Sequence, residues 1–93
     1  MDTTKTYPRP HPQTAGRVID GEAVLILADA SQINVLNQVG SLIYELSDGQ
    51  HSVADIASQL AARFDVSYAQ AESDTLEFLH GLETQSIMIL ETR

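Results

Sequence analysis

The side chains most often used in catalysis and metal binding are few in this chain and lie far apart in it. The three histidines, His11, His51 and His80, show neither the H-x-x-x-H nor the H-E-x-x-H spacing that brings two imidazoles to one metal ion. Glu77 and His80 form an i, i+3 pair like those of di-iron bundles, but such a site needs several pairs. The chain has no cysteine, no G-x-S-x-G motif and no glycine-rich phosphate loop. We therefore predict that it holds no metal and no cofactor and is not an enzyme.

Composition and charge narrow the class of protein further. A chain of 93 residues with 43% hydrophobic residues is the size of one globular domain. Its apolar runs fall short of the roughly 20 residues that span a bilayer, and its N-terminus lacks the apolar region of a signal peptide. We therefore expect a cytoplasmic protein without a membrane partner. The net charge is −8, and residues 64–91 contain six acids and no Lys or Arg, which argues against nucleic-acid binding.

Residues 1–16 differ in composition from the rest of the chain. The three prolines, Pro8, Pro10 and Pro12, alternate within this stretch. Each removes a backbone donor and favours an extended conformation in the residue before it. We expect a flexible, Pro-rich N-terminal arm over residues 1–16 and one folded domain over residues 17–93.

Three short strands are predicted at the start of the folded domain. Arg17–Ile19 is typical of a strand and is followed by a tight turn at Asp20-Gly21. The continuously apolar stretch Ala23–Leu27 favours a central strand. A polar hairpin loop at residues 28–32 then leads into the third strand, which ends at Leu36. This order predicts an antiparallel meander with the third strand at its edge.

Three helices follow, each with a recognisable start. Asn37, Ser52 and Ser67 are good N-caps that precede apolar residues at helical spacing. The third helix is expected to end near Thr84. Its expected core stripe consists of Ala71, Thr75, Phe78, Leu79 and Leu82. After it, Ile87–Leu90 forms a short apolar C-terminal segment, either a last strand or a packed extension. The whole order predicts an α+β protein with a winged helix-turn-helix, in which a three-stranded antiparallel sheet is followed by three helices.

The edge strand is the feature most suited to binding. An extended peptide could add to it as a further strand, while the peptide's side chains fill a groove against the third helix. Backbone hydrogen bonds alone would be marginal against the cost of association, so the groove must also bury apolar groups. The candidates are Val35, Leu76, Leu79 and His80. For Leu79, a place in the core is an equally good interpretation.

Several runs of this sequence resemble the PqqD family, whose members are associated with the biosynthesis of pyrroloquinoline quinone (PQQ) and other ribosomally made, modified peptides (RiPPs). The resemblance covers about residues 17–89. Its most specific pieces are Leu36-Asn37, the I-Y-E-L-x-D-G run at Ile43–Gly49 and the D-x-x-x-F-L run at Asp74–Leu79.

The resemblance implies a RiPP recognition element, which is a non-catalytic peptide chaperone with a winged helix-turn-helix fold. In such proteins the leader of a precursor peptide, such as a PqqA-like peptide, adds as a fourth strand beside the third. The precursor is then presented to a tailoring enzyme, such as a radical SAM protein. Carried over to this chain, the resemblance assigns peptide binding to Gln32, Ile33, Asn34, Val35, Leu36, Leu76, Leu79, His80 and Glu83.

Two other functions stay open at this point. The strand edge could pair with a second copy of the chain, which would make the protein a self-associating adaptor or homodimer. The winged-helix shape could also serve a transcription regulator, although an acidic third helix disfavours DNA.

Overall fold

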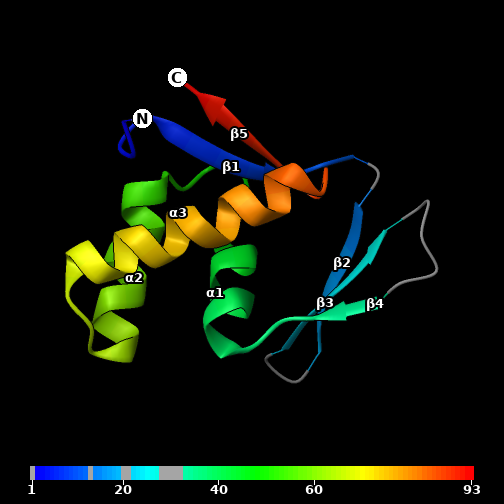
Figure 1. Ribbon diagram of the computed structural model, residues 1–93, viewed down its shortest axis with the longest axis horizontal. Coiled ribbons are helices and arrows are strands. Elements are labelled where there is room, and N and C mark those ends of the chain that lie inside the picture. The colour runs from blue at the N-terminus through cyan, green and yellow to red at the C-terminus, as the bar shows by residue number, and fades with distance from the viewer. Residues whose placement is uncertain (1, 13, 20–21, 28–32) are drawn as a thin grey trace.

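A computed structural model describes residues 2–12, 14–19, 22–27 and 33–93, and for residues 14–19, 22–27 and 33–35 it describes the backbone. The chain is an α+β protein with antiparallel sheets, as the sequence predicts (Figure 1). The turn predicted at Asp20-Gly21 and the loop predicted at residues 28–32 lie outside the described residues. In chain order the elements are β1 (Thr6–Pro10), β2 (Thr14–Ile19), β3 (Glu22–Leu27), β4 (Ile33–Val35), α1 (Gln38–Leu46), α2 (Val53–Phe64), α3 (Tyr68–Thr84) and β5 (Met88–Thr92).

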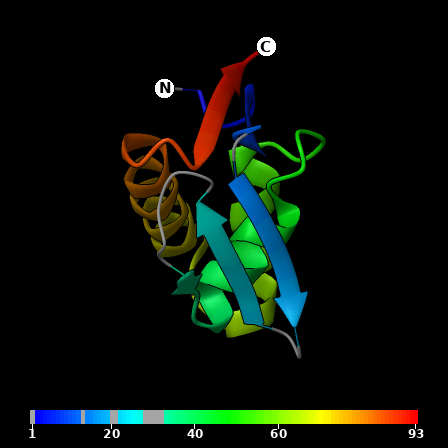
Figure 2. The same cartoon turned by 90° about the vertical axis from the view of Figure 1, so that its right-hand side faces the viewer.

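The strands β2, β3 and β4 form a three-stranded antiparallel sheet in that order. The register pairs Arg17 with Val24 across β2 and β3, and Leu25 with Asn34 across β3 and β4. These strands lie close to the predicted positions, although β2 begins at Thr14 rather than at Arg17. β4 lies at one end of the sheet, and Figure 2 shows it on the side that α3 occupies.

A second, two-stranded sheet corrects the prediction for the N-terminal arm. Thr6–Pro10 pairs antiparallel with Met88–Thr92, with Pro8 opposite Leu90. This part of residues 1–16 is therefore a strand of the fold rather than a flexible arm, and the C-terminal apolar segment is a strand as well. Each proline lacks a backbone donor, but a strand with one neighbour needs donors on its paired side alone, so these prolines are compatible with a strand.

Backbone hydrogen bonds show on which side of β1 the prolines stand. The N–H of His11 donates to the carbonyl of Ile87 at 2.8 Å, so the odd-numbered residues here face the C-terminal strand. Pro8 faces the other way, because its carbonyl accepts from the N–H of Gly49 at 2.9 Å. By the two-residue period of a strand, Pro10 lies on the same outer edge as Pro8. The prolines thus leave the pairing with β5 intact. At Pro8 the outer side is occupied by Gly49, and at Pro10 the missing donor is one that a further strand would need.

Side-chain caps begin the helices at the predicted residues. The side chain of Asn37 accepts from the N–H of Gly40 at 2.7 Å and begins α1. Ser52 and Asp55 form a reciprocal capping box at the start of α2. Ser67 accepts from the first turn of α3 in the same way. Each cap satisfies a donor that the first helical turn leaves without an intrahelical partner.

The core lies among the helices and the β1–β5 pair. α2 packs against α3, α3 packs on β5, and α1 lies against β3. Figure 1 shows the three-stranded sheet to one side of the helices, and Figures 1 and 2 show β1 and β5 at one end of them. Within the described residues, every buried side-chain polar atom has a hydrogen-bond partner, and no helix has the length and apolar character needed to cross a membrane. Among the residues whose side chains are described, the buried hydrophobic ones are Ile43, Val53, Ile56, Ala57, Leu60, Ala71, Leu79, Leu82, Ile87 and Met88.

The turn between α1 and α2 is tied to the end of the chain. Gly49 has a φ of +80°, which favours glycine, and its carbonyl accepts from Arg93 Nη2 at 2.8 Å. Asp48 orders the same turn, because its Oδ1 accepts from the N–H of Gln50 at 2.8 Å and lies 3.0 Å from His51 Nδ1. Partial burial acts to raise the pKa of Asp48, but these hydrogen bonds outweigh it and hold the pKa below its ordinary value of 3.8.

Candidate functional site

The strand that the sequence singles out lies at the rim of the sheet. Within the described residues, β4 pairs with β3 on one side and with no strand on the other. Backbone N–H and C=O groups on an unpaired side can accept an added strand. β4 consists of Ile33–Val35, Leu36 links it to α1, and Gln32 lies outside the described residues.

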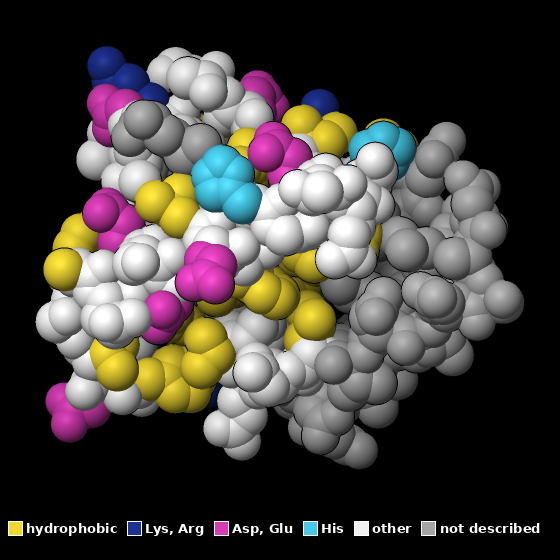
Figure 3. Space-filling view, viewed as in Figure 1, with side chains coloured by type: hydrophobic (Ala, Val, Ile, Leu, Met, Phe, Trp, Pro, Cys, Tyr) yellow, Lys and Arg dark blue, Asp and Glu magenta, His cyan; other side chains and the backbone are white. Residues whose placement is uncertain are grey.

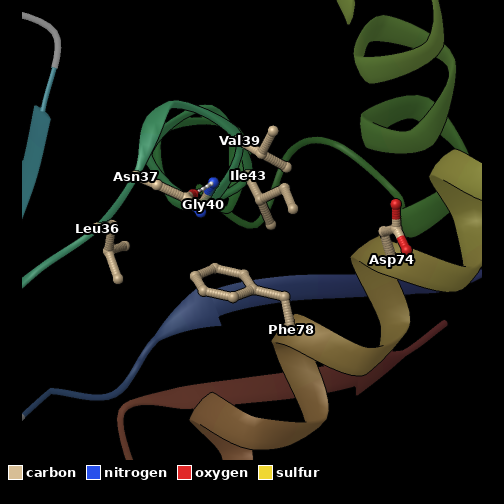
Figure 4. A pocket seen from close by; sticks show the side chains of 7 residues that line it. All are labelled: Leu36, Asn37, Val39, Gly40, Ile43, Asp74 and Phe78. Atoms are coloured by element: carbon tan, nitrogen blue, oxygen red, sulfur yellow. Dashed lines mark hydrogen bonds between the residues drawn. The ribbon is translucent and has the colours of Figure 1, made fainter. Parts of the chain in front are cut away.

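A groove lies beside this edge, between the start of α1 and the middle of α3. Figure 3 shows hydrophobic side chains gathered in a hollow below α3, with acidic side chains along the helix. The groove has a volume of about 320 Å³. This volume is at the lower end of the roughly 300–1,000 Å³ of sites for small molecules, and it is enough for one or two side chains of a peptide. We call it the Phe78 groove, and among the described residues it is lined by Leu36, Asn37, Val39, Gly40, Ile43, Asp74 and Phe78 (Figure 4).

Phe78 and Gly40 fit closely against each other in the groove. A Cβ placed on Gly40 would stand 3.1 Å from Cζ and 3.2 Å from Cε1 of Phe78, and 3.1 Å from Asn37 Oδ1. Figure 4 shows the Phe78 ring under the first turn of α1 and beside Leu36. Because Gly40 has no side chain, the ring can approach the backbone of α1 and form the apolar wall of the groove.

Asp74 adds a carboxylate to this lining. Its Oδ1 accepts from Gln70 Nε2 at 2.8 Å, one helical turn earlier on α3. In Figure 4 the carboxylate stands at the end of the groove opposite to Leu36. The groove therefore has an apolar end next to β4 and a negatively charged end further along α3.

The structure places Leu79 in the core rather than on the groove. Its side chain is 0% exposed and belongs to the same buried cluster as Ile43 and Ile56. A fully buried side chain offers no surface to a ligand, so the assignment of Leu79 to the groove wall is wrong. The alternative interpretation, a core residue, is confirmed.

The other predicted wall residues lie on the opposite flank of α3 from the groove. At 3.6 residues per turn, Leu76, His80 and Glu83 fall on one side of the buried stripe. Asp74 and Phe78 fall on the other side, which is the side that lines the groove. The buried stripe itself consists of Ala71, Thr75, Leu79 and Leu82.

Contacts on that opposite flank agree with this placement. Glu72 lies one turn before Leu76, and its carboxylate accepts from Thr3 Oγ1 at 2.8 Å, so the flank faces the N-terminal segment. His80 Nδ1 and Glu83 Oε1 are 3.6 Å apart, and their side chains are 52% and 46% exposed. In the proposed site we therefore replace Leu76, His80 and Glu83 with residues of the groove flank.

Sequence reasoning missed the α3 side of the groove for a physical reason. It assigned Phe78 to the core stripe and gave Asp74 no role. One signal was available, because the D-x-x-x-F spacing puts Asp74 and Phe78 one turn apart on the same flank. Spacing within one helix does not tell which flank turns toward a neighbouring strand.

A second hollow lies on another face of α1. It measures about 500 Å³, but its described lining comes from α1 and the end of α2 rather than from the strand end, and it contains both an acid and a base. Among the described residues, no group of three or more His, Asp or Glu side chains is placed to hold a metal ion. The described lining of this hollow is Gln38, Leu42, Glu45, Arg63 and Phe64.

Fold and groove together define the class of this protein, a small α+β domain that holds a strand edge next to an apolar groove. The family model described as coenzyme PQQ synthesis protein D (PqqD) matches residues 22–87, which include β3, β4 and the three helices. The chain belongs to the PqqD family, and the resemblance seen in its sequence is confirmed.

Curated relatives point to the same family. The PqqA binding protein of Xanthomonas euvesicatoria pv. vesicatoria is 31% identical over 65 residues, which cover 70% of this chain and 71% of the relative. The PqqA binding protein of Xanthomonas oryzae pv. oryzae is 29% identical over 65 residues, with the same coverage of 70% and 71%.

Two solved structures share the fold. A lasso peptide synthetase B1 complexed with the leader peptide matches with a TM-score of 0.79 and 24% identity, over 88% of this chain and 96% of that one. The PqqD truncation of Methylobacterium extorquens PqqCD, described as a stand-alone RiPP recognition element, matches with a TM-score of 0.69 and 24% identity, over 96% and 99%. At this level of identity the likeness concerns the fold.

Proposed function

We propose that this protein is a non-catalytic, peptide-binding adaptor. It binds the leader of a ribosomally made precursor by strand addition to β4 and presents it to a tailoring enzyme, such as a radical SAM protein. The proposal places it in the cytoplasm, where ribosomes release such precursors. The observation that carries the proposal is the edge of β4 beside the Phe78 groove, an edge that pairs with no strand in the described part of the chain. The proposal is supported by relatives that are PqqA binding proteins and by the fold shared with a leader-bound lasso peptide synthetase B1.

The short length of β4 determines how the binding energy must be divided. In Ile33–Val35 and the following Leu36, about two residues point their backbone groups outward, which allows roughly four hydrogen bonds. At about 0.5–1.5 kcal/mol net for each bond, they contribute roughly 2–6 kcal/mol. Association costs at least about 4 kcal/mol, so these bonds alone do not hold a peptide. Burial of one or two apolar side chains against Leu36 and Phe78 adds about 1.5–3 kcal/mol each. At the upper end of these values, the net binding free energy corresponds to a dissociation constant in the micromolar range.

We further propose that β3, β4 and the three helices form a winged helix-turn-helix that serves peptide rather than DNA binding. α2 and α3 are joined by a short turn in which Asp65 is left-handed, with a φ of 55°. In DNA-binding proteins of this shape, the second helix of such a pair enters the major groove. Here the exposed side of α3 carries Glu77 and Glu83, and the helix contains no Lys or Arg. Its charge opposes a phosphate backbone.

Proline substitutions on β4 test strand addition. Successive residues of a strand direct their N–H groups to opposite sides. Of the two variants Asn34→Pro and Val35→Pro, one therefore removes a donor to β3 and the other removes a donor on the open edge. The probe is a displayed library of random dodecapeptides, and the affinity of selected peptides is measured by fluorescence anisotropy. The edge variant should keep its circular dichroism spectrum and bind at least about 10-fold more weakly, and unchanged affinity in that folded variant would contradict the proposal.

A change in the peptide gives a second test that leaves the protein intact. N-methylation removes one backbone donor from the peptide. In a strand paired with β4, the N–H groups of every second residue face the protein strand. Two versions of one selected peptide are made, one methylated at its odd-numbered residues and one at its even-numbered residues. One version should lose binding and the other should keep most of it. Equal losses in both versions would rule out a strand-like binding mode.

Self-association through the same edge is the main rival. Light scattering over a dilution series distinguishes it from peptide binding. A stable dimer of the free protein that selected peptides do not dissociate would assign the edge to a second copy.

A further inference from the structure

Asp74 is the acidic member of the described lining of the Phe78 groove. Because Gln70 Nε2 donates to its Oδ1 at 2.8 Å, the carboxylate has a defined direction and its Oδ2 can accept another donor. Figure 4 shows it beyond the Phe78 ring, at the far end of the groove from Leu36. A peptide that passes β4 and crosses the ring therefore arrives at a carboxylate.

Within the described residues, Asp74 takes part in no ion pair. α3 carries three further acids and no Lys or Arg. Within the described part of the chain, the arginine side chains that form ion pairs do so elsewhere, since Arg9 and Arg93 both contact Glu91. The carboxylate of Asp74 and the other acids of α3 therefore favour a positively charged group on a ligand.

We infer that the groove recognises a peptide in which an apolar residue is followed or preceded, at a fixed spacing, by a Lys or Arg whose side chain reaches Asp74. The inference rests on the proposed function and adds to it the chemistry of the preferred peptide. Apolar contact with Leu36 and Phe78 provides affinity for many peptides. The carboxylate discriminates among them, because an acidic residue at that position meets a like charge.

The hydrogen bond from Gln70 also bears on the choice between the two basic residues. A two-pronged contact with Arg engages both oxygens of a carboxylate. Oδ1 of Asp74 already accepts from Gln70, but each carboxylate oxygen can accept two donors, so a single bond from Lys and a two-pronged contact with Arg are both open. Lys and Arg can therefore both serve.

Peptide selection on the wild-type protein and two variants tests this inference. Asp74→Asn keeps the shape of the side chain and an acceptor for Gln70 but removes the charge. Glu77→Gln removes the same charge from an exposed position of the same helix and is the matched control. All three proteins are presented with the same library of random dodecapeptides. Wild type and Glu77→Gln should enrich peptides that combine the apolar residue with a Lys or Arg at constant spacing, whereas Asp74→Asn should enrich the apolar residue alone.

The affinity of one selected peptide gives the size of the effect. Replacing its basic residue by Gln should weaken binding to the wild-type protein about 3- to 5-fold. The same replacement should leave binding to Asp74→Asn nearly unchanged. The difference in the wild-type protein should shrink as the salt concentration rises, because an exposed ion pair is screened.

The outcomes separate this inference from the proposed function. A basic preference that persists in Asp74→Asn, that is lost equally in Glu77→Gln, or that is absent from the wild-type protein overturns the role of Asp74 and leaves strand addition in place. Failure to select any peptide, or binding that the edge proline on β4 does not affect, overturns the proposed function and this inference with it. A dimer of the free protein that Asp74→Asn dissociates would assign the groove to a second copy.

Discussion

Replacing Gly40 by alanine tests whether the groove depends on the close fit between α1 and Phe78. In an ordinary helix interior this change stabilises by about 0.8–1 kcal/mol, because alanine is the better helix former. Here the new Cβ would stand 3.1 Å from Phe78 Cζ and 3.1 Å from Asn37 Oδ1, whereas carbon atoms prefer about 3.5–4.0 Å. Displacing the ring and loosening the cap costs about 1–3 kcal/mol. We therefore expect Gly40→Ala to lower the free energy of unfolding by roughly 0–2 kcal/mol despite its better helix propensity.

Comparing the effect of Gly40→Ala in the wild-type protein and in a Phe78→Leu variant tests this expectation directly. Phe78→Leu removes the ring atoms nearest to Gly40, so in that background Gly40→Ala keeps its helix propensity and loses the main clash. Its effect on the free energy of unfolding, measured by urea denaturation and circular dichroism, should move toward stabilisation by about 1 kcal/mol. The same effect of Gly40→Ala in both backgrounds would refute the contact. In the protein that retains Phe78, Gly40→Ala should also weaken peptide binding, because the displaced ring changes the groove wall.

Three further predictions concern the core, the turn between α1 and α2, and the outer edge of β1. Leu79→Ala should lower the free energy of unfolding by about 2–5 kcal/mol because Leu79 is fully buried. His80→Ala, at an exposed residue, should change it by less than about 0.5 kcal/mol. Equal losses for the two variants in urea denaturation would contradict the assignment of Leu79 to the core. The pKa of Asp48 is lowered from 3.8 in the folded protein, so its carboxylate stabilises the fold above that pH, and the contribution is lost as the pH falls through the lowered pKa. Asp48→Asn should therefore flatten the acid side of a plot of urea midpoint against pH below about pH 4, and an unchanged profile would exclude this role. Replacing Pro10 by Thr returns one donor to the outer edge of β1 and should cause association that increases with concentration in light scattering; a variant that stays monomeric would show that Pro10 does not protect this edge.

Local chemistry in the sequence was sufficient to predict most of the secondary structure. The N-caps at Asn37, Ser52 and Ser67 begin the helices where they were expected, because a cap acts on the first turn of its own helix. β3 and β4 lie where apolar runs and alternation place them, since those patterns extend over only a few residues. The peptide-binding role of the β4 edge stays a prediction.

Long-range contacts decided the rest. The pairing of β1 with β5 joins the two ends of the chain, and nothing local to Pro8 and Pro10 reveals that a partner strand lies on the side away from their missing donors. The groove shows the same limit, because Gly40 and Phe78 meet only once α1 and α3 are packed together.

The sequence by itself determined which residues share a flank of α3, because the period of a helix is fixed by its hydrogen bonds. Only the tertiary structure decided that the flank of Asp74 and Phe78, rather than that of Leu76 and His80, turns toward α1 and the end of β4. The physical reason is that the rotation of α3 about its axis is set by its packing against α2 and β5, which lie elsewhere in the chain.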